Sequence, residues 1–96
     1  MLYAITAILK DDAEAKLEGL AADFNEHLSQ PFRKVRMAGP LCSAEGRRAG
    51  YLALVEADSL EEAKRYLDES PLTKANLYSR SEVLEYRIEL GSLAGD

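Results

Sequence analysis

The sequence of 96 residues contains a single cysteine, Cys42, and a single histidine, His27. One cysteine excludes an intramolecular disulfide, and one cysteine with one histidine cannot form a closed zinc site of Cys and His ligands. No group of three acidic residues has the spacing of metal ligands, and the acids that begin the predicted helices are explained by capping and the helix dipole. We therefore expect neither a metal nor any other cofactor.

Basic residues are fewer than acidic ones, 12 against 17, which gives a net charge of -5. Binding to a phosphate backbone depends on neutralising phosphates with cations, so nucleic acid is not an expected partner. The sequence also lacks an apolar run near the roughly 18 residues of a membrane helix, and its first residues lack the features of a signal peptide. We expect a cytoplasmic protein without a membrane partner.

The length allows one compact domain, because domains typically take about 100 to 200 residues. Its share of hydrophobic residues, 47%, is that of an ordinary globular protein. We assign residues 1–90 to this domain and expect residues 91–96 to be a flexible C-terminal tail, since they are small or polar. A domain of this size is marginally stable alone, which favours dimerisation.

Hydrophobic periodicity predicts strands and helices in the order βαββαβ. The nearly all-apolar residues 2–9 form a strand, and residues 17–28 repeat apolar side chains at helical spacing, with Asp11 or Asp12 as the helix cap. The remaining elements are predicted strands at 33–42, 49–57 and 82–90, a helix that Asp58 and Ser59 open, and a helical turn at 72–77. Residues 43–48 form a hairpin loop.

The faces of these strands select a topology. The strand at 49–57 is apolar on both faces, with Leu52 and Leu54 opposite Tyr51, Ala53 and Val55. The strand at 2–9 is also apolar on both faces, whereas the strands at 33–42 and 82–90 each have a charged face. We predict an α+β ferredoxin-like fold, a four-stranded antiparallel sheet with the two apolar strands in its centre and two helices on one face. A second copy would cover the other face, so we expect a homodimer through the sheets.

Several segments resemble the YCII-related family. They are residues 1–5, the Ala38-Gly39-Pro40-Leu41 end of the second strand, residues 51–57, residues 59–63, and the Ser70-Pro71 turn that leads to residues 75–78. Together they cover nearly the whole chain in the right order. The resemblance implies a dimeric α+β barrel of ferredoxin-like subunits. We place a ligand-binding cleft between sheet and helices, near Tyr3, Gly39, Pro40, Cys42, Ser70 and Pro71.

Members of this family are thought to be enzymes because many carry a histidine on the first helix and an aspartate before the proline that follows the second helix. Here the residue before Pro71 is Ser70, which does not accept a proton usefully at neutral pH. The family's histidine would fall near residues 21–23, more than a helical turn from where His27 stands. The sequence therefore departs from the family pair at both positions, and His27 is kept as a candidate catalytic residue.

Three groups of side chains each allow two interpretations. His27 lies about 70° from the centre of the apolar stripe, so it is either a partly exposed structural residue or a general base. Cys42 is either a buried, inert thiol or, with Ser43, part of the mouth of the cleft. The basic cluster of Arg33, Lys34, Arg36, Arg47 and Arg48 either protects an edge strand by its charge or captures a small anionic ligand. The five tyrosines are expected in the core or the dimer interface.

Three functions remain open at this stage. The first is a small-ligand-binding or catalytically degenerate family member whose ligand is a small anionic or aromatic molecule. The second is a small-molecule enzyme that performs acid-base or lyase chemistry on an aromatic or carboxylate substrate, with His27 as the base. The third, which the resemblance implies because relatives are sometimes fused to transcription-initiation factors, is a regulatory interaction domain.

Overall fold

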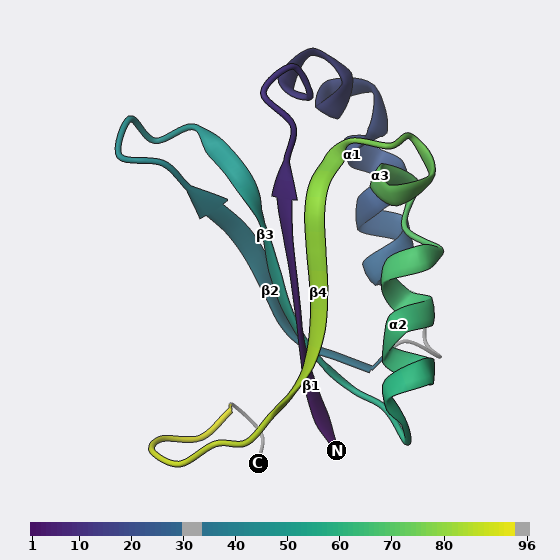
Figure 1. The fold of residues 1–96 in the computed structure, drawn as a ribbon, viewed down its shortest axis with the longest axis vertical. Helices are drawn as coiled ribbons and strands as arrows, with labels where there is room; N and C mark the ends of the chain where they lie inside the picture. The colour runs from purple at the N-terminus through teal and green to yellow at the C-terminus, as the bar shows by residue number, and fades with distance from the viewer. Residues whose placement is uncertain (30–33, 94–96) are drawn as a thin grey trace.

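The computed structural model describes residues 1–29 and 34–93 and contains a four-stranded antiparallel sheet with helices on one face (Figure 1). The elements are β1 (Leu2–Leu9), α1 (Glu14–Leu28), β2 (Lys34–Cys42), β3 (Arg48–Glu56), α2 (Leu60–Asp68), α3 (Pro71–Lys74) and β4 (Tyr78–Tyr86). The strand order β2-β3-β1-β4 puts β1 and β3 in the centre. The ferredoxin-like prediction is therefore confirmed. No helix within the described ranges has both the length and the apolar character to cross a bilayer.

Two apolar clusters fill the space between the sheet and the helices. The α2 cluster consists of Tyr3, Ile5, Ala53, Val55, Ala57, Ala63 and Tyr66. The α3 cluster consists of Leu9, Ala13, Leu72 and Leu77, with partly buried side chains of α1 packed against it. The clusters form because alternate residues of β1 and β3 face the helices, which buries every second side chain of β1.

The two long helices begin in different ways. Ser59 caps α2 as predicted: its hydroxyl accepts the Glu62 backbone N–H at 3.2 Å, and the Glu62 carboxylate accepts the Asp58 N–H at 3.0 Å. The prediction that Asp11 or Asp12 caps α1 is wrong, because the cap is Ala13 and no side chain bonds the free N–H groups. Ala13 is 1% exposed within the α3 cluster, so its burial sets where α1 starts.

A β-bulge changes the predicted faces of β2. Val35 is opposite Val55, but Met37 is opposite Leu54, so Arg36 is an extra residue in the ladder. Val35 consequently packs against the α2 cluster, whereas Met37 lies on the helix-free face of the sheet and is 53% exposed. Regular alternation would put both residues on one face, and the extra residue separates them. Arg36 forms an ion pair with Glu56.

The last strand lies at residues 78–86, four residues earlier than the predicted 82–90. The partner strand explains the shift, because Tyr86 is opposite Leu2, the first residue of β1, and later residues have no β1 residue to pair with. Of the predicted tail, Gly91 to Leu93 are described, and Leu93 is buried. Residues 94–96 lie outside the described ranges, and the flexible tail stays a prediction.

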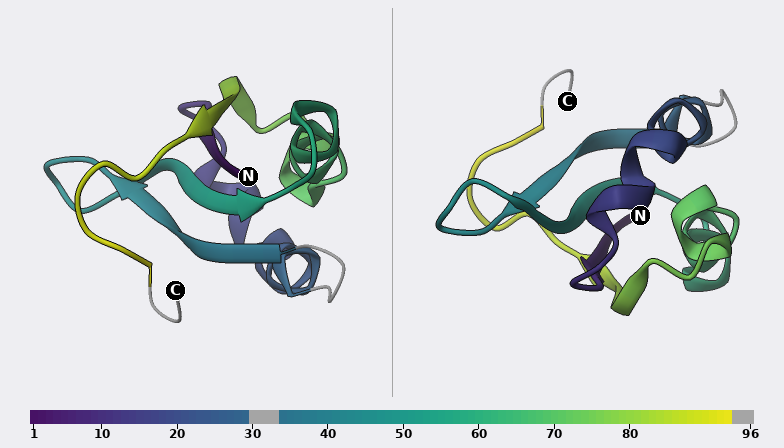
Figure 2. Two further views of the ribbon diagram at one scale, coloured as in Figure 1. Left: turned by 90° about the horizontal axis from the view of Figure 1, so that it is seen from below. Right: turned by 90° about the horizontal axis from the view of Figure 1, so that it is seen from above.

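The helix-free face of the sheet keeps exposed apolar side chains. Leu84 and Tyr86 are opposite Ala4 and Leu2 and are 61% and 44% exposed. They alternate with Val83, which packs against the α2 cluster on the other side. Both turned views show α1 and α2 on the same side of the sheet (Figure 2). One face of the sheet is therefore covered by helices, and the other is covered only in part.

At Gly50 the backbones of the two central strands leave no room for a side chain. Gly50 is buried in β3 opposite Ile8, and an added Cβ would overlap the backbone carbonyl oxygen of Ala7. Because that oxygen belongs to the sheet ladder, Gly50→Ala is expected to lower the free energy of unfolding by about 2–3 kcal/mol, measured by urea denaturation. Gly39→Ala is the control, since an added Cβ there meets nothing within 4 Å. Equal stability of the two variants would contradict this account.

Candidate functional site

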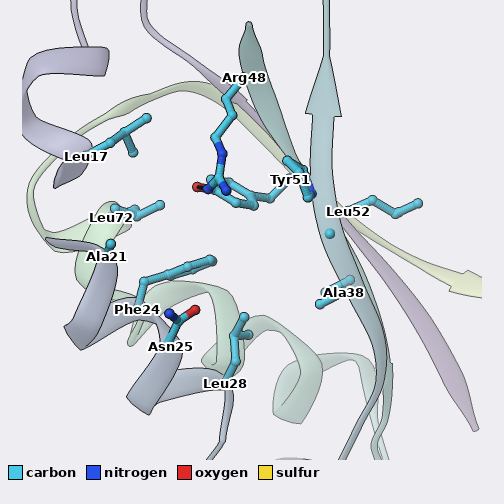
Figure 3. Close-up of a pocket in the computed structure, with 13 residues that line it drawn as sticks. Leu17, Ala21, Phe24, Asn25, Leu28, Ala38, Arg48, Tyr51, Leu52 and Leu72 are labelled. Carbon is cyan, nitrogen blue, oxygen red and sulfur yellow. Dashed lines mark hydrogen bonds between the residues drawn. The ribbon is translucent and has the colours of Figure 1, made fainter. Parts of the chain in front are cut away.

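A cavity of about 280 Å³, the outer cavity, lies between α1 and the sheet (Figure 3). Its apolar lining comes from both sides, with Leu17, Ala21, Phe24 and Leu28 from α1 and Ala38, Gly39 and Pro40 from β2. The polar groups on its wall belong to Asn25, Arg48 and Tyr51. A dry cavity of about 150 Å³ accepts benzene, so the outer cavity has room for one substituted aromatic ring.

Two aromatic rings meet across this cavity. Phe24 projects from α1 and Tyr51 from β3, with their ring centroids 4.8 Å apart and their planes at 51° (Figure 3). This tilted arrangement is favourable for aromatic pairs and contributes about 0.5–1.5 kcal/mol beyond the burial of area. The pair joins the helix layer to the sheet in the middle of the site.

Arg48 lies beside the Tyr51 ring. Its Nη1 donates a hydrogen bond of 2.9 Å to the Tyr51 hydroxyl, and its guanidinium carbon is 5.9 Å from the ring centroid. Regular alternation would put these two residues on opposite faces of β3. They share a face because Leu41 is opposite Gly50 but Cys42 is opposite Arg48, which leaves Ala49 as an extra residue. This second bulge turns the arginine toward the cavity.

A smaller cavity of about 40 Å³, the inner cavity, lies between α1, α2 and the sheet. Its polar lining comes from three distant segments: His27 at the end of α1, Ser70 before α3, and Tyr78 at the start of β4. Phe24, Leu28, Tyr51 and Ala53 line both cavities. The two cavities are therefore neighbours, and they share a wall.

His27 is buried, being 8% exposed, and links two helices. Its Nε2 lies 2.7 Å from the backbone carbonyl oxygen of Tyr66 in α2. A carbonyl oxygen only accepts, so Nε2 carries a proton and donates it. The structure thus places His27 in the core, where it bonds α2 and also lines the inner cavity, rather than at a partly exposed position.

Ser70 and Tyr78 place two hydroxyl groups at the inner cavity. Ser70 Oγ accepts the Leu72 N–H at 3.3 Å and caps α3. Burial raises the pKa of Tyr78 to about 12, and a hydrogen bond from the Ser70 hydroxyl acts in the opposite direction, while the nearby Tyr51 raises the value further. Tyr78 is therefore a neutral phenol at physiological pH.

The predicted cleft residues divide into two groups. Gly39 and Pro40 line the outer cavity, and Ser70 lines the inner one. Tyr3 lies elsewhere: it is opposite Val55 in the α2 cluster, 4% exposed, and its hydroxyl points to the Met1 sulfur at 3.8 Å. The reason is its position along β1, since the cavities lie near Ala7 at the other end of that strand.

Two further predicted residues do not line either cavity. Cys42 ends β2 with its thiol exposed, so the interpretation of a buried thiol is wrong. The second bulge is next to it, at the edge of the hairpin. Pro71 is the first residue of α3, where its missing N–H costs no hydrogen bond, and it is half-buried.

The basic cluster separates in the structure. Arg36 pairs with Glu56, Lys34 and Arg47 are exposed, and Arg48 lines the outer cavity. Arg33 lies outside the described residues. Within residues 1–29 and 34–93, no group of three or more His, Cys, Asp or Glu side chains could hold a metal ion.

Four residues of the site did not stand out in the sequence. In the sequence, Phe24 belongs to the apolar stripe of α1 and looks like any core residue. Tyr51 and Tyr78 look like two of several core tyrosines. Arg48 was recognised only as part of a basic cluster. No pattern in the sequence separates Tyr51 and Tyr78 from the other tyrosines.

Comparison with known proteins relates this geometry to a family. The family model of the YCII-related domain matches residues 1–87. A 5-chloro-2-hydroxyhydroquinone dehydrochlorinase from Burkholderia phenoliruptrix, solved with 2,5-dihydroxybenzoquinone, is 22% identical with a TM-score of 0.82, covering 91% of this chain and 94% of that one. The search of curated proteins gave no match.

More distant structures share the same fold. A proposed antibiotic biosynthesis monooxygenase from Bacteroides thetaiotaomicron is 13% identical with a TM-score of 0.61, covering 100% of this chain and 95% of that one. A hypothetical protein from Pyrococcus horikoshii is 16% identical with a TM-score of 0.51, covering 93% of each chain. At these identities the structures establish the fold, whereas the family model spans nearly the whole sequence. The chain therefore belongs to the family of the YCII-related domain.

Proposed function

We propose that this protein binds a small aromatic molecule with an anionic group, and that the ring lies in the outer cavity with the anion at Arg48. The observation that carries the proposal is the juxtaposition of the Phe24 and Tyr51 rings with one guanidinium at the wall of an apolar cavity. Apolar walls favour burial of a ring, and a guanidinium donates paired hydrogen bonds to carboxylate or phenolate oxygens.

The charge of Arg48 is available to such a ligand. In the part of the chain that the structure describes, its guanidinium bonds the Tyr51 hydroxyl and no carboxylate. The Tyr51 contact also holds the arginine at the cavity wall, so little conformational entropy remains to be lost on binding. Arg48 is therefore a prepared anion-binding group.

The structural neighbour supports the same class of ligand. The dehydrochlorinase acts on a chlorinated hydroxyhydroquinone and was solved with a dihydroxybenzoquinone, which is a planar ring with acidic oxygens. The outer cavity of the present protein has the volume and the polarity for a ring of this kind.

Ligand binding is favoured over acid-base catalysis by the polar groups that are present. Ser70 is not a base at neutral pH, and Nε2 of His27 is already bonded to the Tyr66 carbonyl oxygen. One observation supports catalysis as the second candidate: His27 and Ser70 line the same inner cavity. An enzyme of this kind would act on the same aromatic ligand. The regulatory role and the cytoplasmic location stay predictions.

Substitution of Arg48 tests the proposed function. Benzoate and 2,5-dihydroxybenzoquinone are the probes, and isothermal titration calorimetry measures their affinity. Arg48→Met is expected to weaken binding of both by about 10-fold to 100-fold, because a hydrogen bond to a charged group contributes about 1.5–3 kcal/mol. Arg47→Met, at an adjacent exposed arginine, is the control and should change the affinity less than about twofold. Equal effects of the two substitutions would contradict the assignment.

We also propose that two copies associate through their helix-free faces. The support is the row of exposed apolar side chains there, among them Met37, Leu84 and Tyr86. Burial of this surface in a homodimer would contribute about 25 cal/mol per Å² before the cost of association. The same arrangement is implied by the family resemblance.

Substitution of Leu84 tests this association. Leu84→Glu puts a charge within the proposed contact, and it is expected to raise the dimer dissociation constant at least about 100-fold. Sedimentation equilibrium should then give a mass near the 10.6 kDa of one chain instead of about twice that value. Leu60→Glu, at a 40% exposed residue of α2, is the control and should leave the dimer intact. A monomeric wild type would refute the proposal.

A further inference from the structure

We infer that the Phe24–Tyr51 pair divides one ligand site into two compartments, and that the inner cavity takes a neutral oxygen of the ligand, which the Tyr78 hydroxyl binds. This inference rests on the proposed function and narrows its ligand class. The ligand would be an aromatic ring with an anionic group at one end, bound by Arg48, and a hydrogen-bond-accepting oxygen, such as a carbonyl or quinone oxygen, at the other.

The two cavities are separated by side chains that can move. Phe24 and Tyr51 line both, and the contact of their rings closes the passage between the compartments. The Tyr51 ring is held by the hydrogen bond from Arg48. The Phe24 side chain makes no hydrogen bond and is only half-buried on α1. Its rotation therefore costs less free energy than rotation of the Tyr51 ring, and this rotation opens the passage. Figure 3 shows Phe24 between the helix and the Tyr51 ring.

Tyr78 supplies the inner cavity with a hydrogen-bond donor. Its side chain lines the cavity, and its hydroxyl keeps its proton at physiological pH because burial raises the pKa of Tyr78 to about 12. The inner cavity thus offers a donor to a ligand.

The size and charge of the inner cavity select what enters it. A cavity needs about 10–15 Å³ for each water-sized group, so the 40 Å³ available would hold about three or four non-hydrogen atoms and not a ring. Neither an acidic nor a basic residue belongs to its described lining apart from His27, which already donates to the Tyr66 carbonyl. No arginine or lysine belongs to the described lining of the inner cavity, whereas Arg48 lines the outer one, so the anionic group stays at Arg48 and a neutral oxygen enters.

Three probes separate the effect of size from the effect of hydrogen bonding: unsubstituted benzoate, 4-ethylbenzoate and 4-formylbenzoate. The ethyl and formyl groups have the same number of non-hydrogen atoms, but only the formyl group accepts a hydrogen bond. The wild-type protein is expected to bind 4-formylbenzoate about five to ten times more tightly than 4-ethylbenzoate, as measured by calorimetry. Tyr78→Phe should reduce this ratio to about one.

Two further variants complete the test. Tyr3→Phe removes the hydroxyl of another buried tyrosine, far from the cavities, and should preserve the ratio. Phe24→Ala opens the passage and should improve binding of both para-substituted probes relative to benzoate, while the preference for the formyl group remains. Circular dichroism and thermal melting confirm that each variant is folded, and Phe24→Leu replaces Phe24→Ala if the latter is not.

The outcomes distinguish this inference from the proposed function. If benzoate binds in an Arg48-dependent manner but the formyl preference is absent, or survives Tyr78→Phe, the inner compartment is refuted and the outer site stands. If neither para-substituted probe binds to the wild type or to the Phe24 variant, the inner compartment is likewise refuted and the outer site stands. If no probe binds, including benzoate, both proposals fail.

Discussion

The position of Tyr51 is the constraint on which the candidate site depends. Its ring is in contact with Phe24 on one side and its hydroxyl accepts a hydrogen bond from Arg48, so the helix layer, the sheet and a cation meet at one residue. Both cavities share its wall. A molecule that entered this region would exchange contacts with each of these groups.

Irregular strand pairing gives the site its polarity. The sheet has two bulges in the β2–β3 ladder, one at Arg36 and one at Ala49. The first directs one arginine into an ion pair with Glu56, and the second directs Arg48 to the cavity. Two residues of the same charge in the same hairpin thereby acquire different environments through the local geometry of the backbone alone.

The sequence predicted those features that follow from burial. Strand order could be inferred because Leu52 and Leu54 make both faces of β3 apolar, and the Ser59 cap of α2 follows from side-chain chemistry next to the helix. The bulges could not be predicted, since an extra residue leaves no mark in the alternation around it. The site depends on the bulge at Ala49 and on the meeting of His27, Ser70 and Tyr78, which only tertiary packing brings together.

The pairing of Leu2 with Tyr86 puts the first residue of β1 and the last of β4 side by side at one end of the sheet. The register places Ala7, Tyr51 and Tyr78 toward the opposite end, where the cavities lie. A substitution at this end of the sheet is therefore separated from both cavities by most of the length of β1 and β4.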